Sequence, residues 1–208
     1  MKTILITAFE PFGGSGRNSS LDTLRSLPEE IGGIRIRKAE IPVEYVRCGE
    51  ALADAVREIP EGDLSAVLCL GQAEGRGNIT PEYLAVNVRH AGIADNAGLL
   101  CRYDRIEEDG PAALFATLPA ERITERLTER GIPAAPSFSA GTYVCNSLLY
   151  AALRLAAPRG IPAGFIHLPL SAEIAEAEGK AGRVNALPQE TLTKGIAEAV
   201  RVIAEESY

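Results

Sequence analysis

The chain has 208 residues, enough to bury one sizeable core, and no linker-like stretch divides it, so we expect a single domain over residues 1–208. Its 21 Lys and Arg are outnumbered by 28 Asp and Glu, and the net charge is −7. With no basic cluster and no apolar stretch as long as a membrane span, we expect neither a nucleic-acid partner nor a membrane partner.

The first half of the chain alternates between predicted strands and helices. An apolar opening segment, Thr3–Phe9, predicts a strand. It runs into a glycine-rich loop, Glu10–Ser20, which ends in residues favoured at helix N-termini and predicts a short helix after it. Isoleucines within 34–41 suggest a second strand, and Val43–Ile59 has helical spacing. Ser65–Gly71 is a continuous apolar run of the kind found in buried parallel strands.

The second half continues this alternation. Tyr83–Val88 is expected to be extended, and Pro119–Arg130 predicts a helix with Pro at its start and Gly just past its end. Ala134–Ser139 and Gly164–Leu168 predict two further strands, and Pro188–Ser207 predicts a closing helix. Strands that alternate with helices favour an α/β sandwich with a largely parallel sheet.

The glycine-rich loop allows two interpretations. A strand, glycines and then a helix form a common phosphate site, but Gly14–Ser19 lacks the third glycine of GxGxxG and no GK[ST] follows. Phe9 and Phe12 are the better clue, since two aromatic rings at a strand end could wall an apolar pocket. Alternatively, Phe9 belongs to the core and Phe12 anchors the loop.

Four cysteines are spread along the chain with no CxxC pair, which argues against a metal or redox motif. Cys48 and Cys69 fall in predicted core elements, whereas Cys101 lies in a loop-like region that the pattern does not place. The first residues read as a strand rather than as a signal peptide. We therefore expect free thiols, a cytoplasmic location, and neither a metal nor a cofactor.

Cys145 stands out as a candidate nucleophile. Small, flexible residues precede it and an apolar helical run follows, which places the sulfur near a helix N-terminus. The partial positive charge there favours a thiolate, and the free N–H groups could hold an oxyanion. The alternative is a buried structural cysteine.

A nucleophilic cysteine needs a base, and the chain has two histidines. His167 lies in a short apolar run that predicts a buried strand, whereas His90 lies in a polar segment. One helix joining two neighbouring parallel strands would bring Cys145 and His167 together at the carboxyl edge of the sheet. We expect a Cys145–His167 dyad; the alternative is a histidine satisfied within the core.

Four segments together resemble pyroglutamyl peptidase type I, the pyrrolidone-carboxylate peptidase family. They are Thr7–Gly14, Leu70–Arg76, Ile79–Asn87, and the Cys145 and His167 segments taken as a pair. The resemblance implies a three-layer α/β/α sandwich and a cysteine peptidase that removes an N-terminal pyroglutamyl residue through a thioester. It also implies pyroglutamyl peptides as substrates and a homo-oligomer, commonly a tetramer.

The same resemblance assigns roles to individual residues. It implies Cys145 as nucleophile, His167 as base and then acid, and Glu82 as the carboxylate that orients His167. Nothing in the residue pattern itself selects Glu82 among 28 acidic residues. The resemblance further implies a substrate pocket lined by Phe9, Phe12, Gln72, Tyr143 and Ile93.

One segment departs from the family pattern. Members commonly read Ala-Arg-Ile-Pro-Asp-Asn where this chain has Gly92 in place of Arg and Ala94 in place of Pro. We expect this loop to be more mobile without ligand. Two other functions stay open on the residues: a general thiol esterase or amidase with the same dyad, and a nucleoside-binding α/β protein.

Overall fold

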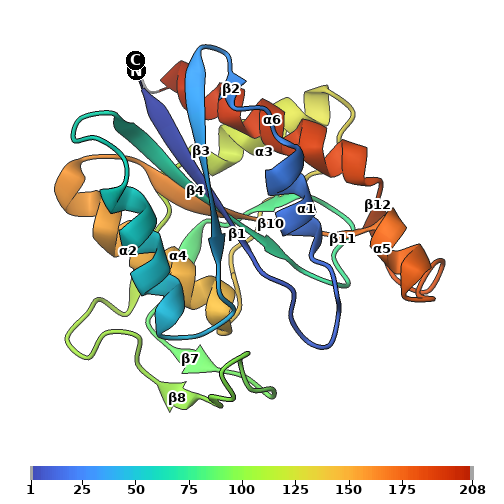
Figure 1. The fold of residues 1–208 in the computed structure, drawn as a ribbon, viewed down its shortest axis with the longest axis horizontal. Coiled ribbons are helices and arrows are strands. Elements are labelled where there is room, and N and C mark those ends of the chain that lie inside the picture. The colour runs from blue at the N-terminus through green and yellow to red at the C-terminus, as the bar shows by residue number, and fades with distance from the viewer. Residues whose placement is uncertain (1, 207–208) are drawn as a thin grey trace.

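The computed structural model describes residues 2–206, and its centre is a six-stranded sheet with the order β2-β3-β1-β4-β10-β5 (Figure 1). Four adjacent strands run parallel: β3 (Ile34–Ile41), β1 (Thr3–Phe9), β4 (Leu64–Gln72) and β10 (Ala163–Leu168). The short edge strands β2 (Glu30–Ile31) and β5 (Thr80–Pro81) are antiparallel to their neighbours. The sheet is therefore mixed but largely parallel, as predicted.

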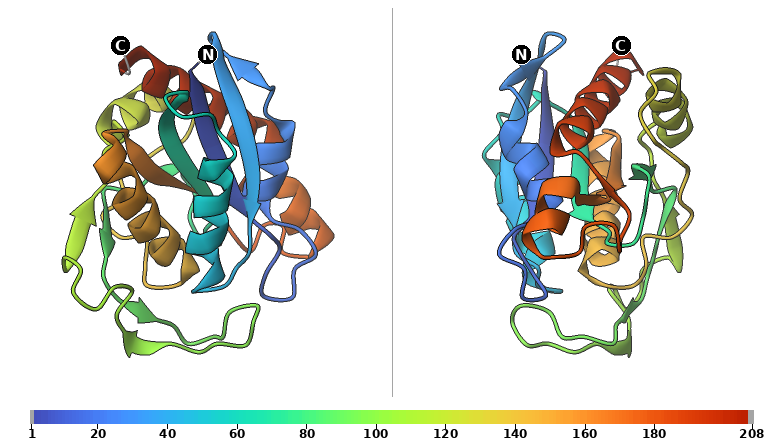
Figure 2. Two further views of the ribbon diagram at one scale, coloured as in Figure 1. Left: turned by 60° about the vertical axis from the view of Figure 1, so that its left-hand side comes forward. Right: turned by 90° about the vertical axis from the view of Figure 1, so that its right-hand side faces the viewer.

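Helices cover both faces of this sheet (Figure 2). One face packs against α1 (Ser19–Ser26), α3 (Ala120–Glu129) and α6 (Gln189–Glu206). The opposite face packs against α2 (Arg47–Arg57) and α4 (Val144–Ala156). The predicted three-layer α/β/α sandwich is confirmed.

The two apolar cores explain why the central strands are continuous apolar runs. In β1, Ile4 and Ile6 enter the core under α1 and α6, whereas Leu5 and Phe9 enter the core under α2 and α4. Successive side chains of a strand point to opposite faces, so a strand covered on both sides needs apolar residues throughout. In β10, Phe165 belongs to the α2 and α4 core, and His167 two residues later shares its face.

Short elements complete the chain around this sandwich. Two short pairs are antiparallel: β6 (Leu84–Val86) with β9 (Ala113–Phe115), and β7 (Arg89–His90) with β8 (Arg102–Asp104). A third pair, β11 (Leu170–Ser171) with β12 (Ala186–Leu187), is parallel. A 3₁₀ turn, η1 (Ala157–Arg159), follows α4, and α5 (Ala172–Ala177) follows β11. Over residues 2–206, no helix combines the length and apolarity needed to cross a bilayer.

The strand predicted over Ala134–Ser139 is wrong. Only Ala134 and Ser137 form isolated bridges, with Ile79 and Glu82 respectively. The N–H groups of Ala135 and Ser137 donate to the carbonyls of Ile79 and Pro81, but Pro81 has no N–H to donate in return, so the pairing is interrupted between the two bridges. The segment nevertheless lies along residues 79–83, which brings it beside the candidate site.

The predicted helices agree more closely. The helix expected over Val43–Ile59 begins later, at Arg47, and the helix expected over Pro119–Arg130 is α3. The helix expected over Pro188–Ser207 is α6, and its last predicted residue lies outside the described residues.

Candidate active site

Cys145 is the second residue of α4, as its surroundings predicted. The helix begins at Val144, after Tyr143, whose backbone is extended (φ −83°, ψ −166°) and whose side chain makes no capping hydrogen bond. The first N–H groups of a helix have no partner within the helix. Here they are left available at the sulfur for an oxyanion.

Gly71, at the carboxyl end of β4, fixes where the sulfur lies. A Cβ placed on Gly71 would fall 2.7 Å from Cζ of Phe165 and 3.2 Å from Sγ of Cys145. Only a residue without a side chain leaves room for both groups. Gly71 is paired in register with His167 on β10, so the sulfur and the imidazole lie over neighbouring positions of the sheet.

His167 is buried, and its Nδ1 lies 2.7 Å from Oε1 of Glu82, just past β5. An ionised carboxylate only accepts hydrogen bonds, so the proton of the neutral imidazole is on Nδ1. The other nitrogen, Nε2, is then an acceptor and can receive a proton from a thiol. The ring of Phe165 packs against the imidazole, with centroids 4.7 Å apart, and fixes its plane.

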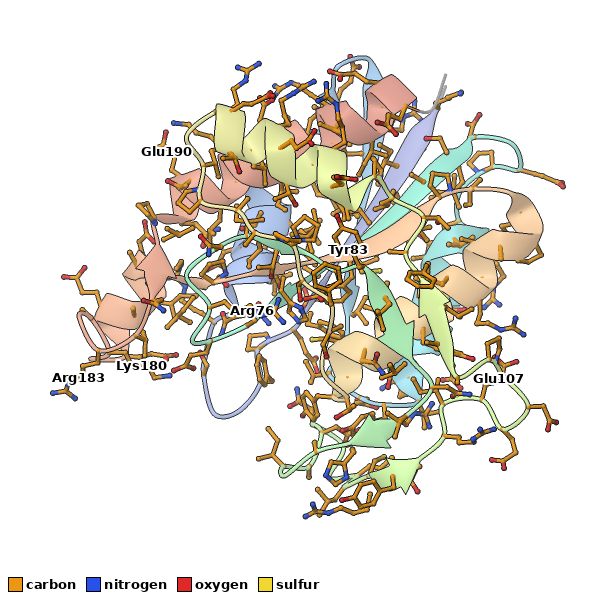
Figure 3. All side chains as sticks on the ribbon, turned by 180° about the vertical axis from the view of Figure 1, so that it is seen from behind. Arg76, Tyr83, Glu107, Lys180, Arg183 and Glu190 are labelled. Atoms are coloured by element: carbon orange, nitrogen blue, oxygen red, sulfur yellow. The ribbon has the colours of Figure 1, made fainter. Side chains whose placement is uncertain are left out.

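Arg76 completes this network, and the sequence analysis assigned it no role. Its Nη1 lies 2.7 Å from the same Oε1 of Glu82 that His167 contacts. Its Nη2 donates to the backbone carbonyl of Ser139 at 3.1 Å. Figure 3 labels Arg76 on the loop between β4 and β5. Its position at the end of the Leu70–Arg76 motif was the available signal, but no local pattern links it to a carboxylate.

The charge state of the Cys145 thiol differs from the one expected from the sequence. Burial raises the pKa of the Cys145 thiol to about 12, whereas the helix start had been expected to favour the thiolate. Burial also lowers the pKa of His167 below its ordinary value, against the opposing effect of its hydrogen bond to Glu82. Both groups are therefore neutral at rest at neutral pH.

The pKa shift of Glu82, unlike those of Cys145 and His167, favours the charged form of the group. Burial alone would raise its pKa, but the hydrogen bond from His167, together with the charge of Arg76, outweighs burial and lowers it. Glu82 is therefore an ionised carboxylate in a buried position. Such a group holds one histidine tautomer and stabilises an imidazolium when it forms.

A small apolar pocket opens beside the sulfur. Four of the predicted substrate residues line it, namely Phe9, Phe12, Gln72 and Tyr143. Its other lining residues are Asn18, Val43, Val144 and Cys145, so no lining side chain is charged. Asn18 and Val43 were not expected from the sequence; the one signal was the N-cap position of Asn18. The fifth predicted residue, Ile93, lies outside this pocket and is 56% exposed.

Gln72 is held in a definite orientation within this pocket. Its Oε1 accepts a hydrogen bond of 2.8 Å from the backbone N–H of Ser19, at the start of α1. Within the described residues, its side-chain nitrogen has no hydrogen-bond partner. That nitrogen can donate to a carbonyl of a bound molecule.

The segment that contains Gly92 and Ala94 borders the pocket through Tyr143, whose hydroxyl donates to the Ala94 carbonyl at 3.0 Å. Beyond this point the buried Asp95 accepts backbone N–H bonds from Tyr45, Ala97 and Leu99. The second half of the loop is thus tied down, whereas the N–H groups of Gly92, Ile93 and Ala94 have no partner among residues 2–206. The predicted mobility stays a prediction, and these contacts confine it to the first half.

The remaining histidine and cysteines lie apart from this chemistry. The ring of His90, in β7, stacks on the exposed ring of Tyr103 at 4.2 Å. All four cysteines are free, and Cys101, which the sequence did not place, is buried just before β8. Across residues 2–206, no cluster of His, Cys, Asp and Glu could hold a metal ion.

A cysteine at a helix start, beside a buried histidine and glutamate at the carboxyl edge of a parallel sheet, defines a cysteine peptidase of α/β/α fold. A family model described as pyroglutamyl peptidase matches residues 2–206. The chain therefore belongs to the pyroglutamyl peptidase family. This assignment favours pyroglutamyl peptidase activity over a general esterase or a nucleoside-binding protein.

Individual relatives agree over nearly the whole chain. The pyrrolidone-carboxylate peptidase of Coprothermobacter proteolyticus is 40% identical over 209 aligned positions, covering 99% of this chain and 98% of the relative. That of Thermococcus kodakarensis is 41% identical, covering 98% and 96%. The crystal structure of Bacillus amyloliquefaciens pyroglutamyl peptidase I superposes with a TM-score of 0.91 at 33% identity, covering 100% of this chain and 98% of that one.

Proposed function

We propose that Cys145, His167 and Glu82 carry the reaction of this cysteine peptidase, the removal of an N-terminal pyroglutamyl residue from a peptide. One observation carries the assignment. The sulfur of Cys145 lies over Gly71, the strand partner of His167, and His167 is hydrogen-bonded to the buried Glu82. In this assignment Cys145 is the nucleophile, His167 the base and Glu82 the orienting carboxylate.

In the first step, the substrate carbonyl lies against Cys145 beneath the start of α4. The Cys145 proton passes to Nε2 of His167 as the sulfur bonds to the carbonyl carbon, and the carbonyl electron pair moves to oxygen. The free N–H groups of the first turn of α4 stabilise this oxyanion. The imidazolium, stabilised by Glu82, then protonates the leaving amine; the C–N bond breaks and a thioester remains.

In the second step, water replaces the departed amine. Neutral His167 takes a proton from this water as its oxygen attacks the thioester carbonyl. The tetrahedral intermediate collapses, the C–S bond breaks, and the proton returns from His167 to the sulfur. Pyroglutamate leaves, and the thiol and imidazole are neutral again, consistent with the raised pKa of Cys145.

The pocket suits a pyroglutamyl residue because this residue has no ammonium group. Its five-membered ring is apolar at the edges, and its lactam offers one N–H and one carbonyl. Phe9, Phe12 and Tyr143 supply walls without charge, and the side-chain nitrogen of Gln72 is free to donate to the lactam carbonyl. A free α-amine would have to give up its hydration in a pocket that offers no carboxylate.

Paired substrates test this proposal directly. Pyroglutamyl anilide and prolyl anilide differ by the lactam carbonyl, which makes the ring nitrogen of the first neutral and that of the second cationic. The wild type should hydrolyse the first and not the second, and a plain acyl ester should be a poor substrate. Cys145→Ser should abolish turnover, and iodoacetamide should modify Cys145 in step with inactivation. Turnover that survives stoichiometric alkylation of Cys145 would exclude it as the nucleophile.

We also propose that the whole chain acts as one catalytic domain within a cytoplasmic homotetramer. The family resemblance supports the tetramer, and four free cysteines suit a reducing compartment. Exposed aromatic side chains, Tyr103 at 79% and Phe115 at 75%, supply apolar surface for subunit contacts. Light scattering coupled to size exclusion would give the subunit number.

A further inference from the structure

The buried charge of Glu82 needs a cation, and this need points to a further residue of the site. The Glu82 side chain is fully buried, and an ionised carboxylate is costly to bury unless it is paired and hydrogen-bonded. His167 is neutral at rest, so it supplies one hydrogen bond but no net charge. The positive charge has to come from elsewhere.

Arg76 supplies that charge through a geometry that also restrains neighbouring segments. Its Nη1 and Nδ1 of His167 each lie 2.7 Å from the same oxygen of Glu82. The guanidinium also contacts Thr80 Oγ1 in β5 and Ser137 Oγ, the latter at 3.3 Å. With its bond to the Ser139 carbonyl, it joins the β4–β5 loop to the segment that leads into Cys145.

We propose that Arg76 is a positioning residue of the peptidase: it keeps Glu82 ionised and aimed, so that His167 presents Nε2 to Cys145. The proposal rests on the roles assigned above to these three residues. Arg76 takes no part in bond making. Its side chain is 29% exposed, so it lies at the margin of the site, whereas Glu82 lies inside it.

The proposal has a consequence for the pH dependence. The charged or titratable groups that face His167 are Glu82 beside β5, Arg76 from the β4–β5 loop, and Cys145 from α4. The charge of Arg76 lowers the pKa of Glu82, of His167 and of Cys145. Without this charge all three groups bind protons more readily, so the acidic limb of kcat/KM should move to higher pH.

The experiment measures kcat, KM and the acidic limb for Arg76→Gln and Arg76→Lys with a pyroglutamyl anilide. For Arg76→Gln we expect kcat to fall on the order of tenfold to a hundredfold, as when the outer hydrogen-bond partner of a metal-ligating histidine is removed. KM should change little, and the acidic limb should move up. Arg76→Lys keeps the charge but loses the fork that reaches Ser139, so kcat should fall while the limb stays in place.

A matched control separates positioning from general stability. Arg126, 16% exposed, makes a similar ion pair with Glu205 between α3 and α6, on the opposite face of the sheet. Arg126→Gln should leave kcat and the acidic limb unchanged. A loss in Arg76→Gln that appears only as lower thermal stability or higher KM, with an unmoved limb, would overturn the proposal. So would a limb in Arg76→Lys shifted as far as that in Arg76→Gln.

A double variant tests the route through Glu82. In Glu82→Gln the carboxylate is already gone, so adding Arg76→Gln should lower kcat little further; full additivity would overturn the proposal. The comparison of the double variant with Glu82→Gln does not need the single Arg76→Gln variant, so it can still be made if that variant folds poorly. Failure of the underlying roles would appear separately, as wild-type turnover that persists after alkylation of Cys145.

Discussion

Gly71→Ala adds one methyl group between the proposed nucleophile, Cys145, and the ring of Phe165, which packs on the proposed base, His167. The new Cβ would lie 2.7 Å from Cζ and 3.0 Å from Cε1 of Phe165, and 3.2 Å from Sγ of Cys145. Carbon atoms pack at about 3.5 Å or more, so roughly 0.8 Å must be recovered by moving the ring, the sulfur or the strand. Phe165 in turn packs on His167, so a displaced ring carries the imidazole with it.

The expected loss is larger in catalysis than in stability. Overpacking of this kind lowers the free energy of unfolding by about 1–3 kcal/mol. A displacement approaching 1 Å at reacting groups can lower the rate by about a hundredfold. We expect Gly71→Ala to lower kcat by between about tenfold and a hundredfold, and to slow alkylation of Cys145 by iodoacetamide.

Gly164→Ala is the matched control, because Gly164 lies in β10 and its added Cβ would crowd Leu118, at 3.0–3.1 Å, in the core under α3 and α6. Both variants should lose stability in thermal unfolding, but only Gly71→Ala should lose kcat. Wild-type kcat in a folded Gly71→Ala protein would refute the placement of the sulfur over Gly71. Equal loss in both variants would attribute the effect to general destabilisation.

Three further outcomes are expected. His167→Ala should lower kcat by orders of magnitude, and His90→Ala should not. The loss of kcat in Glu82→Gln should lie between these two, because this change disturbs orientation rather than removing the base. Steady-state kinetics would show the ranking. The pKa values of Glu82 and His167 are both lowered in the folded state, so unfolding takes up protons at acidic pH. The free energy of unfolding should therefore fall as the pH drops below about 6.5. Thermal melts across this pH range test the prediction, and a melting temperature that does not fall would contradict it. Amide hydrogen exchange at residues 92–94 should be fast without ligand and slower with a pyroglutamate analogue, whereas residues 97–99 should be protected in both states; equal protection at 92–94 would show a loop that is already rigid.

The central strands could be predicted because burial on both faces favours an almost continuous run of apolar residues. Thr3–Phe9 and Ser65–Gly71 follow that rule, and both are strands of the sheet. Ala134–Ser139 failed because the segment it pairs with contains Pro81, which has no N–H to donate. The segment lies along residues 79–83, yet it forms only isolated bridges. Apolar pattern thus identified extended backbone there, but not its hydrogen bonding.

Some residues of the candidate site could likewise be predicted from the sequence, and others could not. Cys145 and His167 could be selected from the sequence, because a helix start and a buried strand leave local signals. Glu82 and Arg76 could not, because their roles arise from contacts: Glu82 meets His167 85 positions further along the chain. The charge state of Cys145 was also misjudged, because the helix start is visible in the sequence, whereas the burial that raises its pKa is a property of the packed core.

The contacts of Arg76 bear on the arginine that the family resemblance places at the position of Gly92. Arg76 reaches the site from the β4–β5 loop, and its donors already serve Glu82, Thr80, Ser137 and the Ser139 carbonyl. These contacts therefore pair it with the carboxylate and the segments around it, not with charge that develops on the substrate. In the proposed mechanism that charge falls to the N–H groups of the first turn of α4, which belong to the backbone and persist whatever residue occupies position 92.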